Sequence, residues 1–398
     1  MSTPGPFGGN PFEGMPFFKD LAKLFASQGA LNVDFAKQLA QWVATEGVAE
    51  SNVDPVVRIR TEELARVAEL HVSATTGLSL TATGRPITVR TTQRGEWALK
   101  TLDDWRPLLE RLATSLGQGA VAGTPEADIE PDPETELLGG IGQLIVPLLM
   151  GGQAGSMVGH LARRVLGQYD LPIPRPKSDE VMVIAANVDQ FAEDWSLPVD
   201  DVRLWVCLSD IAHHAVLNRP HVRERLETLL QDYAAGFRPD PGAIESRFGE
   251  LDPTDPESIN NILGDPQALL GAMQSDEQRA LAPRLEALVV AIEGYVDWVV
   301  DTTGRKLIAS YQALAEALRR RRVERGDGDK LVERLFGLEL GQRQFDRGGA
   351  FVKGVIERAG EDGIHKLWRS AETLPTPNEI DAPGLWLARL EIDEVNEG

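Results

Sequence analysis

The segment from Leu137 to Ala162 constrains the fold most, because its 26 residues include no Asp, Glu, Lys or Arg. A helix of this length is long enough to span a bilayer. Its glycines at 151, 155 and 159 recur every four residues and so share one helix face, which allows close helix–helix approach in a membrane or in a soluble protein. Pro147 and scattered polar residues favour buried helices in a soluble protein, so membrane contact is the less favoured alternative.

Charge and cysteine content narrow the class of protein. The chain has 61 acidic and 40 basic residues, for a net charge of −21, which argues against a nucleic-acid partner because phosphate binding requires concentrated Lys and Arg. Cys207 is the single cysteine, so an intramolecular disulfide is excluded. The N-terminus has no basic segment followed by an apolar one, as a secretory signal would have. We therefore expect a cytoplasmic protein.

Apolar residues recur at spacings of three and four along most of the chain, which predicts a mostly α-helical protein with a few short strands. Strand or extended structure is expected within 73–92 and at 181–185, and a long helix from Val199 to about Leu217. The basic run Arg319–Arg322 is expected to end a helix as a solvated face. The predicted organisation is a Pro/Gly/Phe-rich flexible arm (1–30), a helical region with short strands (31–116), an acidic linker (117–136), the main domain (137–390) and an acidic tail (391–398).

The helix that ends near Leu217 contains Ser209-Asp210-Ile-Ala-His213, followed by His214. Zinc proteases place two histidines four residues apart on one helix face, with a glutamate after the first as general base. Ser209 and His213 have that spacing, whereas His214 points about 100° away from His213. His221 lies just beyond Pro220, where the helix must have ended, and could return to the same site.

A second helix carries Glu293 and Asp297, four residues apart and therefore on one face. In one class of zinc enzymes this pattern supplies a third metal ligand and a carboxylate that orients a ligand histidine. The pattern also occurs often by chance, so it does not by itself place the two helices together.

Longer stretches resemble a known family. The chain resembles the actinobacterial zincin-like metallopeptidase type 2 family, whose members are also catalogued as hydrolases. The matching segments are NPFEGMPFFKDLAKL (10–24), LGQYDLPIPRP (166–176), LWVCLSDIAHHAVLNRPHVRERL (204–226), EGYVDWVVD (293–301) and the region from LVERLFGLEL to LPTPNEIDAP. The resemblance implies a mostly helical zincin-like domain in which an active-site helix packs beside a glutamate-bearing helix.

The resemblance also implies roles for individual residues. Ser209 occupies the position of the first zinc histidine, and Asp210 that of the general-base glutamate. His213 matches the second zinc histidine, Glu293 the third ligand and Asp297 the orienting carboxylate. The chain therefore departs from the zinc-binding pattern at one ligand and at the base.

These departures leave two hypotheses. Catalytic zinc usually has three protein ligands and a water, a serine hydroxyl is a poor ligand at neutral pH, and Asp is one methylene shorter than Glu. The favoured hypothesis is an inactive zincin-fold protein that acts as a binding or scaffold module, with an unidentified protein or peptide partner in the former active-site cleft. The alternative is an active metal-dependent hydrolase or peptidase, with zinc as cofactor and a nonstandard ligand set of Asp210, His213 and Glu293.

Overall fold

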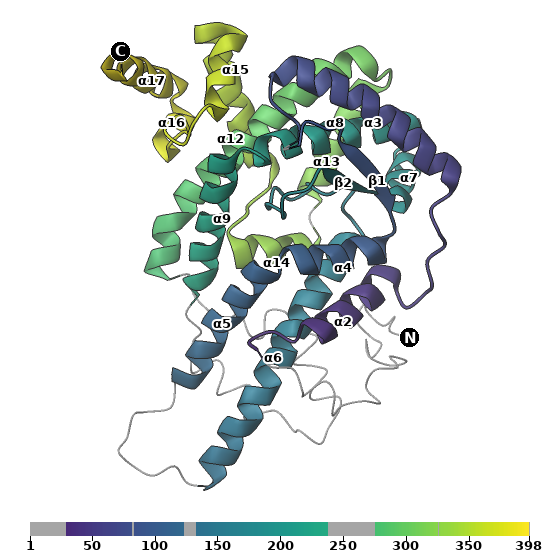
Figure 1. Cartoon of the computed structure of the whole chain (residues 1–398), viewed down its shortest axis with the longest axis vertical. Helices are drawn as coiled ribbons and strands as arrows, with labels where there is room; N and C mark the ends of the chain where they lie inside the picture. The colour runs from purple at the N-terminus through teal and green to yellow at the C-terminus, as the bar shows by residue number, and fades with distance from the viewer. Residues whose placement is uncertain (1–28, 82, 123–132, 238–274, 325, 398) are drawn as a thin grey trace, which may run out of the picture.

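The computed structural model describes residues 29–81, 83–122, 133–237, 275–324 and 326–397, and within these it is mostly helical (Figure 1). Two short strands accompany the helices, which confirms the predicted fold class. The elements are α2 (Val33–Thr45), α3 (Pro55–Thr76), β1 (Thr88–Thr92), α4 (Arg94–Asp104), α5 (Arg106–Ala122), α6 (Pro133–Ala162), β2 (Glu180–Ile184), α7 (Ala185–Asp194), α8 (Val199–Leu217), α9 (Pro220–Ala235), α12 (Asp276–Leu307), α13 (Tyr311–Val323), α14 (Asp327–Phe336), α15 (Gln342–His365), a 3₁₀ turn (Lys366–Trp368), α16 (Pro377–Asp381) and α17 (Pro383–Glu397).

The glycine stripe of α6 packs against α2. A Cβ atom built on Gly151 would lie 2.4 Å from the carbonyl oxygen of Asn32, and one on Gly155 would lie 2.4 Å from that of Ala36. The two backbones are therefore too close for any larger residue, which confirms the interpretation of the stripe as a close helix contact. None of the helices in the described ranges is both long and apolar enough to cross a membrane.

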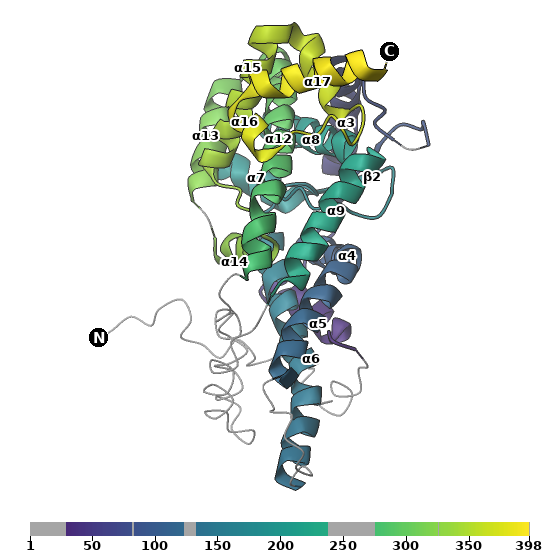
Figure 2. The ribbon, with the colours of Figure 1, turned by 90° about the vertical axis from the view of Figure 1, so that its left-hand side faces the viewer.

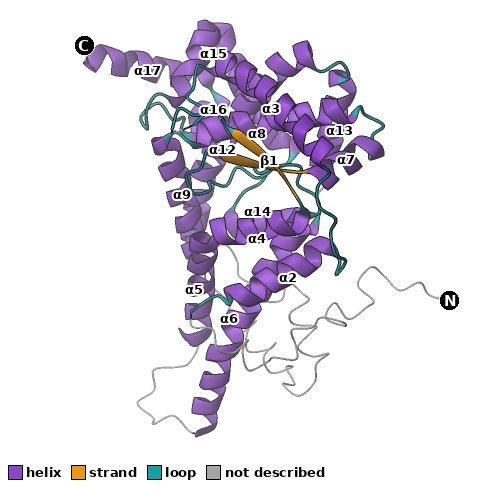
Figure 3. Ribbon diagram, turned by 45° about the vertical axis from the view of Figure 1, so that its right-hand side comes forward, coloured by secondary structure: helices purple, strands orange, loops and turns teal. Residues whose placement is uncertain are grey.

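The two strands join the first and second halves of the chain. β1 and β2 pair in parallel, with Thr88 opposite Glu180 and Thr92 opposite Ile184 (Figure 3). β2 confirms the strand expected at 181–185. The predicted regions 31–116 and 137–390 thus contribute to one sheet and one continuous hydrophobic core.

Fourteen of the 19 residues of helix α8 are buried. The helix packs against α3, α7, α9 and α12, and its bounds match the predicted helix. α12 lies beside it and is held against α15 by Gly294, where a Cβ would lie 2.3 Å from the backbone of Gly348. Figure 2 shows these helices in the body of the molecule, with α5 and α6 projecting from one end and α17 at the other.

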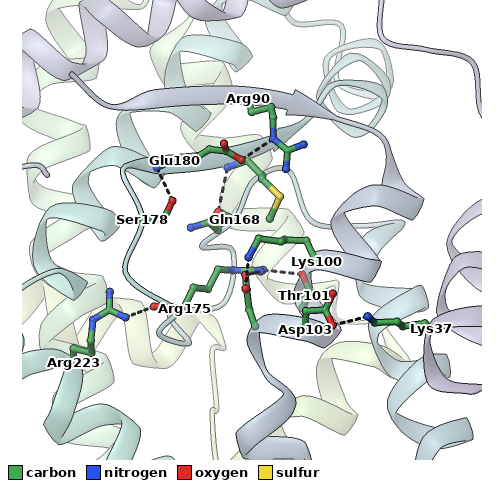
Figure 4. A network of polar contacts seen from close by, with 12 residues as sticks. Lys37, Arg90, Lys100, Thr101, Asp103, Gln168, Arg175, Ser178, Glu180 and Arg223 are labelled. Carbon is green, nitrogen blue, oxygen red and sulfur yellow. Dashed lines mark hydrogen bonds and ion pairs between the residues drawn. The ribbon is translucent and has the colours of Figure 1, made fainter. Parts of the chain in front are cut away.

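Buried Arg175 anchors the extended segment 166–176 that runs alongside α8. Its guanidinium lies 5.3 and 5.5 Å from the ring centroids of Trp97 and Trp105, and it pairs with Asp104 at 2.9 Å. Its carbonyl oxygen accepts a hydrogen bond from Arg223 of α9 (Figure 4). α4 and α9 therefore hold this segment in place next to the candidate site.

Two predicted segments, the linker and the tail, differ from the structure, and a third, the arm, lies mostly outside the described residues. α5 continues to Ala122 and α6 begins at Pro133, so both ends of the predicted linker 117–136 are helical. Proline at the first helical position is favourable because its missing N–H has no intrahelical partner there. The predicted tail 391–398 is helical up to Glu397, as its glutamates are good helix formers. Nearly all of the predicted arm 1–30 lies outside the described residues.

Candidate functional site

A cavity of about 120 Å³ opens between α8, α12, α13 and the turn that follows α6. Ser209 and His213 of α8 line it together with Glu293 and Asp297 of α12. Trp205 and Phe345 add aromatic walls. Residues that are distant in sequence and were predicted to share a site therefore do meet at one cavity.

His213 and Glu293 are in direct contact across the two helices. The Nε2 atom of His213 lies 3.2 Å from Oε1 of Glu293, and its Nδ1 lies 2.9 Å from the carbonyl oxygen of Ser209. Burial opposes protonation of this imidazole, but the Glu293 carboxylate outweighs it and the pKa of His213 is raised above its usual value. Both ring nitrogens thus face acceptors, an arrangement that suits a doubly protonated ring.

Asp210 faces away from this cavity. Its Oδ2 accepts the backbone N–H of Gln168 at 2.9 Å and its Oδ1 accepts that of Tyr169 at 3.0 Å. Burial, with a further contribution from Asp170, raises the pKa of Asp210 to about 7, and the two N–H donors oppose that rise. A Cβ on Gly167 would lie 1.9 Å from Oδ2 of Asp210, so only glycine permits this contact. The carboxylate at the general-base position therefore holds the 166–170 turn.

His214 and Tyr169 continue this contact between α8 and the turn. The Tyr169 hydroxyl lies 3.0 Å from Nδ1 of His214, and the Tyr169 ring also stacks on His213 at a centroid distance of 6.1 Å. Burial, aided by Arg223, lowers the pKa of His214 to about 4. His214 therefore belongs to the packing of the turn.

His221 is not brought to the cavity. It lies in the first turn of α9, and the charged groups that affect the pKa of its imidazole are Arg219, Glu224 and Glu372. None of these lines the cavity.

Two arginines that the sequence analysis assigned to a solvated face line the cavity instead. Arg322 forms a two-bond pair with Asp297, at 3.1 and 2.7 Å, and its guanidinium lies 3.6 Å from the ring centroid of Phe345. Arg321 pairs with Asp170 at 2.6 Å. The expectation was therefore wrong for Arg321 and Arg322.

The expectation holds for the other two members of the run, since Arg319 and Arg320 are exposed and pair with Glu316. Helical periodicity could have separated the pairs. Leu314 and Leu318 of α13 are buried, and Arg321 and Arg322 continue their face one turn later.

The residues at the cavity do not match the ligand set of a catalytic zinc. Such a site usually has three protein ligands that are His, Cys, Asp or Glu. Here the imidazole of His213 and the carboxylate of Glu293 bond to each other, and Ser209 supplies only a hydroxyl. Within residues 29–397, apart from the ranges left undescribed, no three His, Cys, Asp or Glu side chains are grouped closely enough to hold a metal ion.

The contact between His213 of α8 and Glu293 of α12 is the helix arrangement that the family resemblance implied. The model of the zincin-like metallopeptidase family matches residues 31–387, and the chain belongs to this family, as the resemblance implied. The fold is similar to a crystal structure from Chloroflexus aurantiacus described as "a putative hydrolase with a novel fold", with a TM-score of 0.60 and 24% identity over 91% of this chain and 99% of that one. No curated protein matches the chain.

Proposed function

We propose that this protein is a non-hydrolytic binding module built on a zincin-like fold, and that its cavity receives a segment of a protein or peptide partner. The observation that carries the proposal is the position of Asp210. Both of its carboxylate oxygens accept backbone N–H groups of the 166–170 turn. A general base must reach the water or proton on which it acts, and Asp210 does not line the cavity.

The cavity-facing charges support the same proposal. Glu293 is paired with His213, and Asp297, the expected partner of a ligand histidine, is paired with Arg322. These pairs satisfy the carboxylates without a metal ion. The Ser209 hydroxyl and the Trp205 ring remain at the cavity wall as surfaces that a partner can contact, whereas Arg322 covers one face of the Phe345 ring.

A metal-dependent hydrolase is the second candidate. Membership of a zincin-like metallopeptidase family favours this candidate. It is also favoured by the adjacent side chains of His213 and Glu293, which match two of the zinc-ligand positions implied by the resemblance. We infer no hydrolytic step from the donor set described above.

Metal analysis separates the two candidates. The purified protein is dialysed against dilute zinc and its bound metal is measured by mass spectrometry, with His213→Ala as the test variant and His221→Ala as a control outside the cavity. We expect far less than one zinc per chain in all three proteins, and a melting temperature that does not change with chelator. The variant Ser209→His should gain zinc affinity, because it restores an imidazole ligand on the face of α8 that lines the cavity.

The opposite pattern overturns the proposal. About one tightly held zinc per chain, as a catalytic site would hold, would establish a metal centre if it is lost in His213→Ala and retained in His221→Ala.

A further inference from the structure

Helix α3 carries apolar side chains on the face that it turns away from the body of the molecule. Its inner face packs against α8, β1 and α12, and Figure 1 shows the helix at the periphery. The large apolar residues on the outer face are Val56 (71% exposed), Ile59 (54%), Val67 (40%) and Leu70 (67%). We call these four residues the α3 stripe. Single exposed apolar residues are common, but several in line on one helix face mark an interaction surface.

The α3 stripe is symmetric about Glu63. Val56 and Leu70 each lie seven residues from Glu63, and Ile59 and Val67 each lie four residues from it. Two such helices that pair antiparallel around Glu63 therefore bring Val56 of each copy against Leu70 of the other, and Ile59 against Val67. A two-fold interface requires this self-complementarity, because every contact between two residues occurs twice. The spacing thus fits a second copy of this chain.

The charged residues between the two apolar halves are compatible with this pairing. Glu63 already pairs with Arg60 of its own chain at 3.0 Å, and Asp200 also binds Arg60, at 2.8 Å. Arg66 forms no ion pair with any residue that the structure describes. In the antiparallel pair, Arg66 of one copy lies about one helix turn from Glu63 of the other and can pair with that carboxylate. Antiparallel packing also places helix ends of opposite partial charge together.

A membrane surface fits the α3 stripe less well than a second copy does. Helices that lie on membranes border their apolar face with Lys and Arg, which attract anionic lipids. Here Glu63 lies in the middle of the stripe, Glu62 and Glu69 lie on the same helix, and the whole chain has a net charge of −21. These carboxylates would be repelled by an anionic lipid surface.

We propose that two copies of this protein associate through their α3 stripes, as an antiparallel helix pair with Glu63 next to the two-fold axis. The stripe is about 21 Å long. An interface of this size is near the lower end of specific protein interfaces, which bury about 1,200 Å² or more, so we expect a reversible dimer. None of the stripe residues lines the cavity at His213, so the association does not depend on the proposed binding function.

Sedimentation equilibrium of the full chain tests the association. The average mass should rise from the mass of one chain, 43.5 kDa, toward twice that value as the concentration increases from about 1 to about 200 µM. Ile59→Glu should raise the dissociation constant at least about tenfold, because pairing would bury two carboxylates among apolar side chains. The matched control is Ile392→Glu on α17, where the isoleucine is 61% exposed but lies outside the stripe. It should change the dissociation constant by less than about twofold.

Paired charge substitutions test the antiparallel register. V56E/L70E and V56K/L70K each place like charges opposite each other at both ends of the pair, and both should be monomeric. V56K/L70E places opposite charges together, and it should associate at least about tenfold more tightly than either like-charge variant. The two positions are about 21 Å apart on one helix, so this difference must come from contacts between copies. The two like-charge variants change the net charge in opposite directions, which excludes net charge as the cause.

Three results would overturn the proposal. The first is a mass of 43.5 kDa at every concentration, including the case in which the monomer binds vesicles of phosphatidylcholine and phosphatidylglycerol instead. The second is a dimer whose dissociation constant does not change in Ile59→Glu while the melting temperature stays normal, because its interface would then lie elsewhere. The third is a V56K/L70E variant that associates no better than the like-charge variants, as a parallel pair would behave.

Discussion

Two adjacent stripes of helix α8 have different surroundings. Ser209 and His213 face a cavity, and their side-chain partner comes from α12. Asp210 and His214, one residue further along, face the 166–170 turn and are satisfied by backbone N–H groups and by Tyr169. The first stripe is open to a ligand, whereas the second is packed as core. Changes on the turn side should therefore cost stability. On the cavity side, a change at Ser209 should affect mainly binding, whereas a change at His213 should also cost stability because it removes the buried partner of Glu293.

The largest effect is expected from Gly167→Ala. The new Cβ would overlap Oδ2 of Asp210, so this buried carboxylate must move and give up its two N–H donors. We expect a loss of about 3–5 kcal/mol in the free energy of unfolding, measured by urea denaturation. The matched control is Gly349→Ala in α15, where a Cβ meets nothing within 4 Å, and this variant should be neutral or slightly stabilised. Similar stability of the two variants would contradict the tight packing of the turn stripe.

The pH dependence of stability should report His214. Its pKa is about 4 in the folded protein and about 6.5 when the chain is unfolded, so the unfolded state binds more protons between these values. The stabilising contribution is therefore complete above pH 6.5 and is lost as the pH falls through 4, by roughly 2–3 kcal/mol.

Denaturation at pH 4.5 and 7.5 measures this loss, with His214→Gln as the comparison because glutamine keeps a polar partner for Tyr169 and does not titrate. We expect the wild-type protein to lose more stability than the variant between the two pH values. An equal loss in both proteins would mean that His214 is not the group responsible.

The smallest effect is expected from Ser209→Ala on the cavity stripe. Ser209 is half-buried, and its hydroxyl bonds to none of the described residues. The free energy of unfolding should change by no more than about 0.5 kcal/mol. A loss above about 1 kcal/mol in the same denaturation assay would show that both stripes are structural.

Local patterns predicted much of the fold correctly. The period of apolar residues placed α8 at its observed bounds, and the apolar run at 181–185 marked β2. The glycine spacing in α6 predicted a close helix contact, although the partner, α2, was not predicted. These predictions are correct because the period of apolar residues, helix capping and glycine spacing all depend on residues that are close in the sequence.

The candidate site is formed by contacts between residues that are far apart in the sequence, which local patterns do not predict. The resemblance placed His213 near Glu293, but the pairing of Asp297 with Arg322 was not foreseen. The hydrogen bonds between Asp210 and a turn about forty residues earlier were also not predicted. The local sequence around Asp210 does not indicate whether its carboxylate faces a cavity or accepts backbone N–H groups. Arg321 and Arg322 were misassigned because a run of four arginines gives no direct sign of which members are buried.

The amino-acid sequence by itself determined the helical class, the length of α8 and the residue types available on its two stripes, because these follow from interactions between near neighbours. Only the tertiary structure decided which stripe faces the cavity and which carboxylate is held by main-chain donors. The reason is physical: a buried charge takes its partner from whatever segment packs against it, and that segment is chosen by the packing of the whole core.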